Sequence, residues 1–227
     1  MNTELYKRIF TSIFLLVLLT LMFFYTFILI ISVIVVSIIT WIEFYAIISK
    51  IYVKKNNKET ILRFLYKSIS LLYLFTLVYL IVKNQATNPE FNIFFIYTIA
   101  ISVATDIGGY IVGKLIKGKK LTRISPKKTI SGSIGSFILS LILVPFFIYF
   151  SPEKFNNPFD LIILAIIVSF SCQLGDLFIS YLKRKAKVKD TGDLLPGHGG
   201  VLDRIDGILF AVPVGMILWE FLIVIIW

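Results

Sequence analysis

The sequence predicts an all-α, polytopic integral membrane protein with about seven transmembrane helices. The composition is the first observation that predicts it, because 58% of the 227 residues are hydrophobic and only 16% are charged. Mean hydropathy is +0.90, whereas soluble domains carry about 25% charged residues. The second observation is a series of apolar runs long enough to cross a hydrocarbon core of about 30 Å, which accepts only helices or closed barrels. Helices are expected because the alternating pattern of a barrel strand is absent.

The apolar runs define the spans. The first two share one long run, which as a single helix at about 1.5 Å per residue would be about twice the membrane thickness. A tight hairpin near Tyr25 is therefore predicted. The expected spans are Ile9–Phe24, Ile28–Ile48, Ile61–Val82, Phe91–Ile116, Ile130–Phe150, Asp160–Leu182 and Ile205–Trp227.

The distribution of basic residues predicts the orientation of these spans. Cytoplasmic loops carry the excess of Lys and Arg, and with the N-terminus inside only Lys83 and Lys154 of the 23 basic residues face the other side. The prediction is N-terminus in and C-terminus out. This asymmetry largely explains the net charge of +10, so no nucleic-acid partner is inferred. We expect residues 1–90 to form a membrane anchor with possible dimer contacts, and residues 91–227 to be catalytic, with cytoplasmic loops at 114–129 and 183–204.

Two aspartates lie inside predicted spans and require an explanation. A carboxylate there costs about 2.5–3.5 kcal/mol on insertion scales and needs a partner, a hydrated cavity or a function. Asp176 shares one helical face with Gln173 and Ser180, at spacings of three and four residues. Asp106 is equally consistent with an interhelical hydrogen bond and with a direct catalytic role. The nearby Gly109 and Gly113 are best explained by close helix packing.

Two further aspartates, Asp203 and Asp206, stand at the start of the last predicted helix. An acidic residue is stabilised there by the helix dipole, so capping explains one of them. Together with Asp176 they would place three carboxylates near one leaflet, where they repel each other without a cation. Carboxylate and phosphate oxygens are the ligands that magnesium prefers. A metal role is favoured over capping combined with interhelical pairing.

Two polar loops lie on the predicted cytoplasmic side. His198 sits in Pro-Gly-His-Gly-Gly, where glycines allow close backbone approach to a ligand. A lone histidine is usually structural, but its charged neighbours favour ligand binding: Lys189, Asp190, Asp203 and Arg204. The other loop, Lys117 to Ser133, places Lys127 and Lys128 among Ser, Thr and Gly residues, which favours polyphosphate binding over simple positive-inside charge.

The stretch from Ser180 to Asp206 carries a specific resemblance. It reads Ser-x-Leu-Lys-Arg-x4-Lys-Asp-x-Gly-x2-Leu-Pro-x-His-Gly-Gly-Val-x-Asp-Arg-Ile-Asp and resembles the complete signature of the phosphatidate cytidylyltransferase (CDP-diacylglycerol synthase) family. Gln-x-Gly-Asp-Leu at 173–177 and Ser-Pro-Lys-Lys-Thr at 125–129 also resemble family segments. The resemblance covers about residues 100–207, and the first hundred residues are similar only in being apolar.

The resemblance implies that CTP and phosphatidate react to give CDP-diacylglycerol and pyrophosphate. It also implies an all-helical, dimeric protein of the bacterial inner membrane, with a site on the cytoplasmic leaflet that holds Mg²⁺ and a second, monovalent cation such as K⁺. Asp176 and Asp203 match the family's metal-binding aspartates, and Asp206 matches a further essential acidic residue, which we assign to a second cation or to orienting Arg204. We expect catalytic roles for Asp176, Asp203, Asp206, His198 and Lys189, and substrate binding by Lys127, Lys128, Ser180, Lys183, Arg184, Asp190, Gly199, Gly200 and Arg204.

One departure from the family pattern and two other functions are relevant. The family usually follows Ser-Pro-Lys-Lys-Thr with an aromatic residue and Glu-Gly, whereas this chain has Ile130, Ser131 and Gly132. A related CTP-using enzyme acting on another lipid, such as a CDP-archaeol synthase or a polyprenol kinase, would share the fold. A cation transporter would explain Asp106 and Asp176 but not the Lys-Asp-x-Gly loop.

Overall fold

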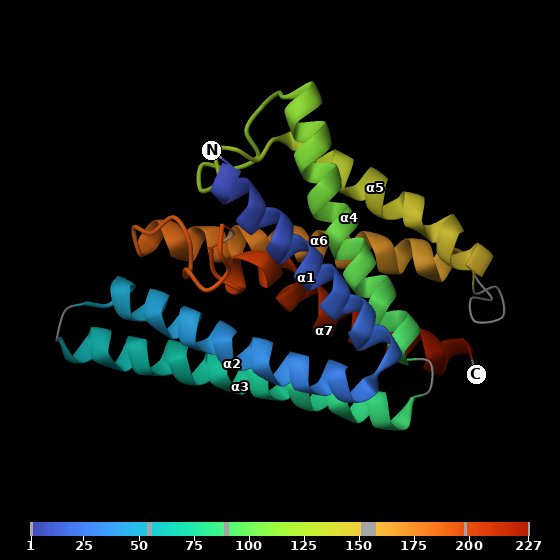
Figure 1. Cartoon of the computed structure of the whole chain (residues 1–227), viewed down its shortest axis with the longest axis horizontal. Helices are drawn as coiled ribbons and strands as arrows, with labels where there is room; N and C mark the ends of the chain where they lie inside the picture. The colour runs from blue at the N-terminus through green and yellow to red at the C-terminus, as the bar shows by residue number, and fades with distance from the viewer. Residues whose placement is uncertain (1, 54–55, 89–90, 151–157, 198, 227) are drawn as a thin grey trace. The chain divides into compact units, whose positions relative to one another are not determined.

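The computed structural model describes all residues except 1, 54–55, 89–90, 151–157, 198 and 227. The described residues form seven helices (Figure 1), and their only β pairings are two isolated bridges. The helices are α1 (Asn2–Phe24), α2 (Thr26–Ile51), α3 (Asn57–Thr87), α4 (Phe91–Ile116), α5 (Ile130–Phe150), α6 (Pro158–Lys185) and α7 (Leu202–Ile226).

The helices confirm an all-helical, polytopic membrane protein. Among the described residues, five helices are long and apolar enough to cross a membrane, namely α2 to α6. In α1 the apolar part is the shorter stretch Ile9–Phe24. The expected total of seven crossings and the orientation remain predictions.

The sequence predicted the helix bounds closely. Two predicted spans, Phe91–Ile116 and Ile130–Phe150, coincide with α4 and α5. The predicted hairpin is also present, since Tyr25 has an extended backbone between α1 and α2. Most other helices extend beyond the predicted apolar runs, because the residues flanking these runs continue the same helix.

The chain divides into two compact units. The first contains Met1–Pro89 and Leu182–Ile205. Within it, α2 lies along α3 (Figure 1). The Trp41 indole donates to the Lys67 carbonyl at 3.3 Å, and the Lys67 ammonium donates to the Ser49 hydroxyl at 2.6 Å. The loop that carries most of the signature motif therefore belongs to the same unit as the N-terminal helices.

The second unit contains Glu90–Tyr181 and Asp206–Trp227. Its core is apolar and centres on fully buried Tyr97, Ile101 and Val168. Serine and threonine hydroxyls join its helices, as where Thr105 donates to Ser169 at 2.9 Å. The assignment of 1–90 and 91–227 as anchor and catalytic parts stays a prediction.

Candidate active site

The signature loop, residues 186–201, begins where α6 ends in a Schellman motif. The Val188 N–H donates to the Lys183 carbonyl at 3.0 Å, and the Lys187 N–H donates to the Arg184 carbonyl at 3.2 Å. Lys187 takes the left-handed position, with φ of 55°, where glycine is more common. The motif turns the chain sharply off the helix and so fixes where the loop starts.

Asp203, in the first turn of α7, accepts hydrogen bonds at both carboxylate oxygens. Its Oδ1 receives the Lys183 ammonium at 2.6 Å. Its Oδ2 receives the backbone N–H of Thr191 at 2.7 Å and that of Gly200 at 3.2 Å, and lies 3.0 Å from the Thr191 hydroxyl. Asp203 therefore joins the end of α6, both halves of the signature loop and the start of α7.

The surroundings of Asp203 keep it ionised. Burial alone would raise the pKa of its carboxyl. The hydrogen bonds from Lys183, Thr191 and Gly200, with the Lys183 charge, outweigh burial and bring the pKa below its usual value. At neutral pH Asp203 is an anion already balanced by one cation.

Glu43 of α2 holds the same loop from a second side. It is buried, and its carboxylate accepts the Thr191 hydroxyl at 2.7 Å. It also accepts the backbone N–H groups of Val201 and Leu202, each at 2.9 Å. An acidic side chain of an apolar helix is thus hydrogen-bonded to the end of the signature loop and to the first residue of α7.

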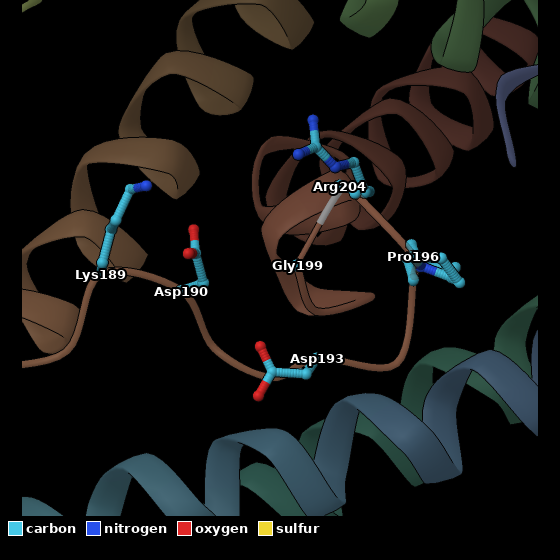
Figure 2. Close-up of a pocket in the computed structure, with 8 residues that line it drawn as sticks. Lys189, Asp190, Asp193, Pro196, Gly199 and Arg204 are labelled. Atoms are coloured by element: carbon cyan, nitrogen blue, oxygen red, sulfur yellow. The ribbon is translucent and has the colours of Figure 1, made fainter. Parts of the chain in front are cut away.

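The signature loop lines an open polar cavity of about 630 Å³. Figure 2 shows the loop running from Lys189 through Asp190 and Asp193 and returning to Arg204 at the start of α7. Gly199, also in the wall, has φ of 83°, a conformation that L side chains rarely adopt. The wall therefore carries two cationic and two anionic side chains, which suits a charged ligand better than an apolar one.

Asp176 has its own set of partners in the second unit. Its carboxylate forms an ion pair with Lys128 and accepts the Ser180 hydroxyl at 3.3 Å. On the same face of α6, the Gln173 side-chain oxygen accepts the Ser133 hydroxyl at 2.6 Å. The predicted polar face of α6 is thus confirmed, and it contacts both the loop that carries the basic Ser-Pro-Lys-Lys-Thr segment and α5, which follows that loop.

The sequence profile of the cytidylyltransferase family matches residues 2–222, which is nearly the whole chain. The chain belongs to the cytidylyltransferase family. Among the relatives it matches are phosphatidate cytidylyltransferases of Rickettsia bellii (43% identical over 136 residues, 57% of this chain and 58% of the relative), Helicobacter pylori strain J99 (35% over 161 residues, 70% and 56%) and Staphylococcus haemolyticus (44% over 129 residues, 56% and 49%). The chain thus spans about half the length of these curated relatives. The profile and the relatives together confirm the family that the signature predicted.

The structure describes most of the predicted cytidylyltransferase site residues. In the first unit it brings together Lys183, Asp203 and Gly200, and it places Lys189, Asp190, Gly199 and Arg204 around one cavity. In the second unit it joins Lys128, Asp176 and Ser180. Lys127 and Arg184 are exposed, and His198 lies outside the described residues.

The remaining predicted polar residues have specific surroundings. Asp206 is buried, and its Oδ1 accepts the Gly207 N–H at 2.9 Å. Asp106 lies 4.0 Å from the Cys172 sulfur, a weak contact between α4 and α6. The Ser131 hydroxyl donates to the Lys117 carbonyl, so the residue at the family's usual glutamate position closes the end of the basic loop.

Sequence reasoning missed Glu43 and Thr191. The signal for Glu43 was present, because an acidic residue inside an apolar span is a functional candidate by the same rule that singled out Asp106 and Asp176. Thr191 gave no comparable signal. A threonine in a polar loop has many explanations, and only the fold reveals that its hydroxyl lies between two carboxylates.

Proposed function

We propose that this chain transfers the cytidylyl group of CTP to phosphatidate, giving CDP-diacylglycerol and pyrophosphate for phospholipid synthesis. Family membership and the names of the matched relatives support this reaction. The observation that carries the proposal is the cavity of about 630 Å³, whose wall includes Lys189 and Arg204. Its volume lies within the range of about 300–1,000 Å³ typical of small-molecule sites.

The reaction requires little from a protein base. A phosphate monoester has a second pKa near 6, so at neutral pH the phosphatidate phosphate is mostly a ready nucleophile. One of its oxygens attacks the α-phosphorus of CTP, the new P–O bond forms, and the bond from the α-phosphorus to the bridging oxygen breaks. Pyrophosphate leaves with the electron pair of that bond.

The main barrier is electrostatic, because two anionic substrates must approach each other. Cationic side chains aimed at the phosphates lower that barrier. We assign Lys189 and Arg204 to polyphosphate binding, and arginine suits bidentate contact with phosphate oxygens. His198, which lies outside the described residues, is assigned to donating to a phosphate or protonating the pyrophosphate. The other candidates for phosphate contact are Lys127, Lys128, Lys183 and Arg184.

The donor chemistry suits the proposed cations. Among the described residues, no group of three or more His, Cys, Asp and Glu side chains gathers to hold a metal. However, Asp176 and Asp203 each hold a lysine ammonium, so each carboxylate accepts a cation in this fold. We propose both as Mg²⁺ ligands and assign Asp206 to a second cation such as K⁺ or to orienting Arg204. Bound Mg²⁺ would neutralise charge on the phosphates.

We further propose that the site faces the cytoplasm at the bacterial inner membrane, as the basic loops suggest. At that face, the lipid head group at the leaflet surface and CTP from the cytosol can reach the same site. The homodimer implied by the family resemblance belongs to this proposal. Light scattering of the purified protein tests the homodimer. A protein mass equal to that of one chain would contradict it.

The test is formation of CDP-lipid from phosphatidate and CTP by purified protein in detergent micelles, across a Mg²⁺ titration. We expect Mg²⁺-dependent product, and a loss of at least about 10²-fold in Asp203→Asn. Asp160→Asn is the matched control, because Asp160 lies in the first turn of α6, at the opposite end of that helix from the signature loop. It should retain activity.

One result would reject the proposed reaction, and another would reject the role assigned to Asp203. One is no product from phosphatidate when the protein is folded and K⁺ is supplied, in which case other lipid acceptors would be tried and then ion flux in liposomes. The other is full activity in Asp203→Asn, which would remove Asp203 from the site while leaving the reaction in place.

A further inference from the structure

Glu43 is a charged residue within an apolar helix that offers it few polar partners. It lies in α2, whose composition and length suit a membrane span, and only 7% of its surface is exposed. A buried carboxylate is costly unless it is hydrogen-bonded. Glu43 is compensated by three donors, all from the signature loop and the first residue of α7.

Two of those donors belong to the N-terminal end of α7. The first N–H groups of a helix have no partner within it, and the helix dipole favours a negative charge beside them. The Val201 and Leu202 N–H groups both point to the Glu43 carboxylate. Glu43 thus occupies from α2 the position that a capping carboxylate or a bound anion would take.

The glycines of the motif fit closely around Glu43. A Cβ built on Gly192 would lie 2.7 Å from Glu43 Oε1, and one built on Gly200 would overlap Glu43 Oε2 and the Thr191 hydroxyl. A side chain at either position would have to displace the Glu43 carboxylate or the loop from the arrangement seen. The substrate-binding role that the sequence assigns to Gly200 stays a prediction, and the structure adds its close approach to Glu43.

Thr191 connects Glu43 to Asp203. Its hydroxyl lies 2.7 Å from Glu43 Oε2 and 3.0 Å from Asp203 Oδ2, while its backbone N–H donates to Asp203 Oδ2 at 2.7 Å. A hydroxyl has one proton to donate. The shorter contact to Glu43 therefore favours donation there and leaves the backbone N–H to hold Asp203.

We infer that Glu43 is a positioning residue for the transfer reaction. Its carboxylate anchors the signature loop and the start of α7 to α2, and through Thr191 it sets the orientation of Asp203. The inference rests on the proposed function for its catalytic consequence, whereas the anchoring of the loop can be measured without any reaction.

The catalytic test compares Glu43→Gln with Thr40→Val. Thr40 is also buried in α2, one helical turn before Glu43, so its replacement controls for a change inside the apolar helix. We expect Glu43→Gln to lower kcat about 10–100-fold, as for other groups that orient a catalytic carboxylate. The KM for CTP should change by less than about threefold, because Glu43 is not in the wall of the cavity. Thr40→Val should behave as wild type.

The structural test is limited trypsin cleavage of the full chain in micelles, read by mass spectrometry. Lys187 and Lys189 are sites within the signature loop, and the basic residues of loop 117–128 are internal reference sites. Glu43→Gln should speed cleavage in the signature loop relative to the reference loop. An amide cannot accept three hydrogen bonds without turning its own N–H group toward a donor.

A second variant covers the possibility that Glu43→Gln does not fold. Thr191→Val removes the hydroxyl but leaves Glu43 its two backbone donors, so folding is retained and kcat should fall by a smaller factor. In the Thr191→Val background, Glu43→Gln should cost less than it does in wild type, because part of its route to Asp203 is already lost.

The outcomes separate this inference from the proposed function. Wild-type activity in Glu43→Gln, additive losses with Thr191→Val, or unchanged loop cleavage would each overturn the positioning role. If wild type makes no CDP-lipid at all, the proposed function fails, while the cleavage comparison still decides whether Glu43 anchors the loop.

Discussion

At the scale of single residues, the pair formed by Lys183 and Asp203 is the point on which the signature loop depends. Both side chains are largely buried, with 17% and 6% of their surfaces exposed. The ammonium offsets the burial of the carboxylate, and the backbone donors of Thr191 and Gly200 complete its hydrogen bonding. Removing one member of such a pair costs more than the pair contributes, because the other charge stays buried.

Lys183→Met should therefore destabilise the protein. We expect a loss of about 1–3 kcal/mol, the general cost of leaving a buried group without one partner, because Asp203 keeps the backbone donors of Thr191 and Gly200. Thermal unfolding in micelles measures it. Lys187→Met is the control, because Lys187 is exposed and keeps its left-handed backbone in either form. Equal stability of the two variants would show that the ion pair contributes nothing.

Residue chemistry was predictable where the motif was specific. The signature identified Asp203 and its lysine-rich surroundings, and the structure brings Lys183 to it. It could not identify Lys128 as the partner of Asp176, because that pairing depends on how α5 and its preceding loop pack against α6. Glu43 shows a different kind of miss, since the rule that applies to it was used only for aspartates.

At the scale of helices, the pair α4 and α5 shows how small residues set the contact. A Cβ built on Gly108 would overlap the Gly135 carbonyl, and one built on Gly135 would overlap the Val112 side chain. Small residues at such contacts let helices approach closely in a membrane. The prediction that Gly109 and Gly113 serve packing is confirmed, because a Cβ built on either would lie about 3 Å or less from α5 or the residue before it.

The space around each glycine predicts how much an alanine substitution there destabilises the protein. A methyl group at Gly135 meets Val112 and also lies 2.9 Å from the Gly108 carbonyl, so Gly135→Ala should cost about 1–3 kcal/mol as an overpacked site. At Gly113 the nearest atom is the Thr129 hydroxyl oxygen at 3.0 Å. There the gain in helix propensity, about 1 kcal/mol, should offset the contact.

Thermal unfolding of the two alanine variants in the same detergent provides the comparison. Because both sites lie on the same helix pair and receive the same methyl group, they control for each other. If Gly113→Ala were the more damaging change, close approach at Gly135 would not be what limits the contact between α4 and α5.

At the scale of the whole molecule, hydropathy and charge were enough to predict the class and most of the helix bounds. A long apolar run predicts a membrane-spanning helix, and the ends of two such runs coincide with the bounds of α4 and α5. Tertiary grouping was not predictable in the same way. The chain order suggested an anchor followed by a catalytic part, which stays a prediction, and it gave no sign that residues 182–205 group with the N-terminal helices. Hydrophobic periodicity carries no signal for this grouping. A buried acidic residue such as Glu43 does, because it requires polar partners from another part of the chain.

The placement of positive charge predicts the orientation of the helices in the membrane. Crossing the membrane is unfavourable for loops rich in Lys and Arg, so these loops remain cytoplasmic. The loop between α4 and α5 carries Lys119 among many basic residues. Asn88, just after α3, has a single basic residue nearby in the sequence, Lys83. We therefore expect opposite sides of the membrane for Lys119 and Asn88.

Single cysteines test this directly in a Cys172→Ser background, since Cys172 is the one native cysteine. A membrane-impermeant maleimide added to intact spheroplasts should label Asn88→Cys and leave Lys119→Cys unlabelled until the membrane is opened. The reverse pattern would place the basic loops outside, away from cytosolic CTP, and would contradict the proposed site as well as the topology. Labelling of both positions before opening would place both on the outer side. That result would contradict a single crossing of the membrane by α4, the one helix between them.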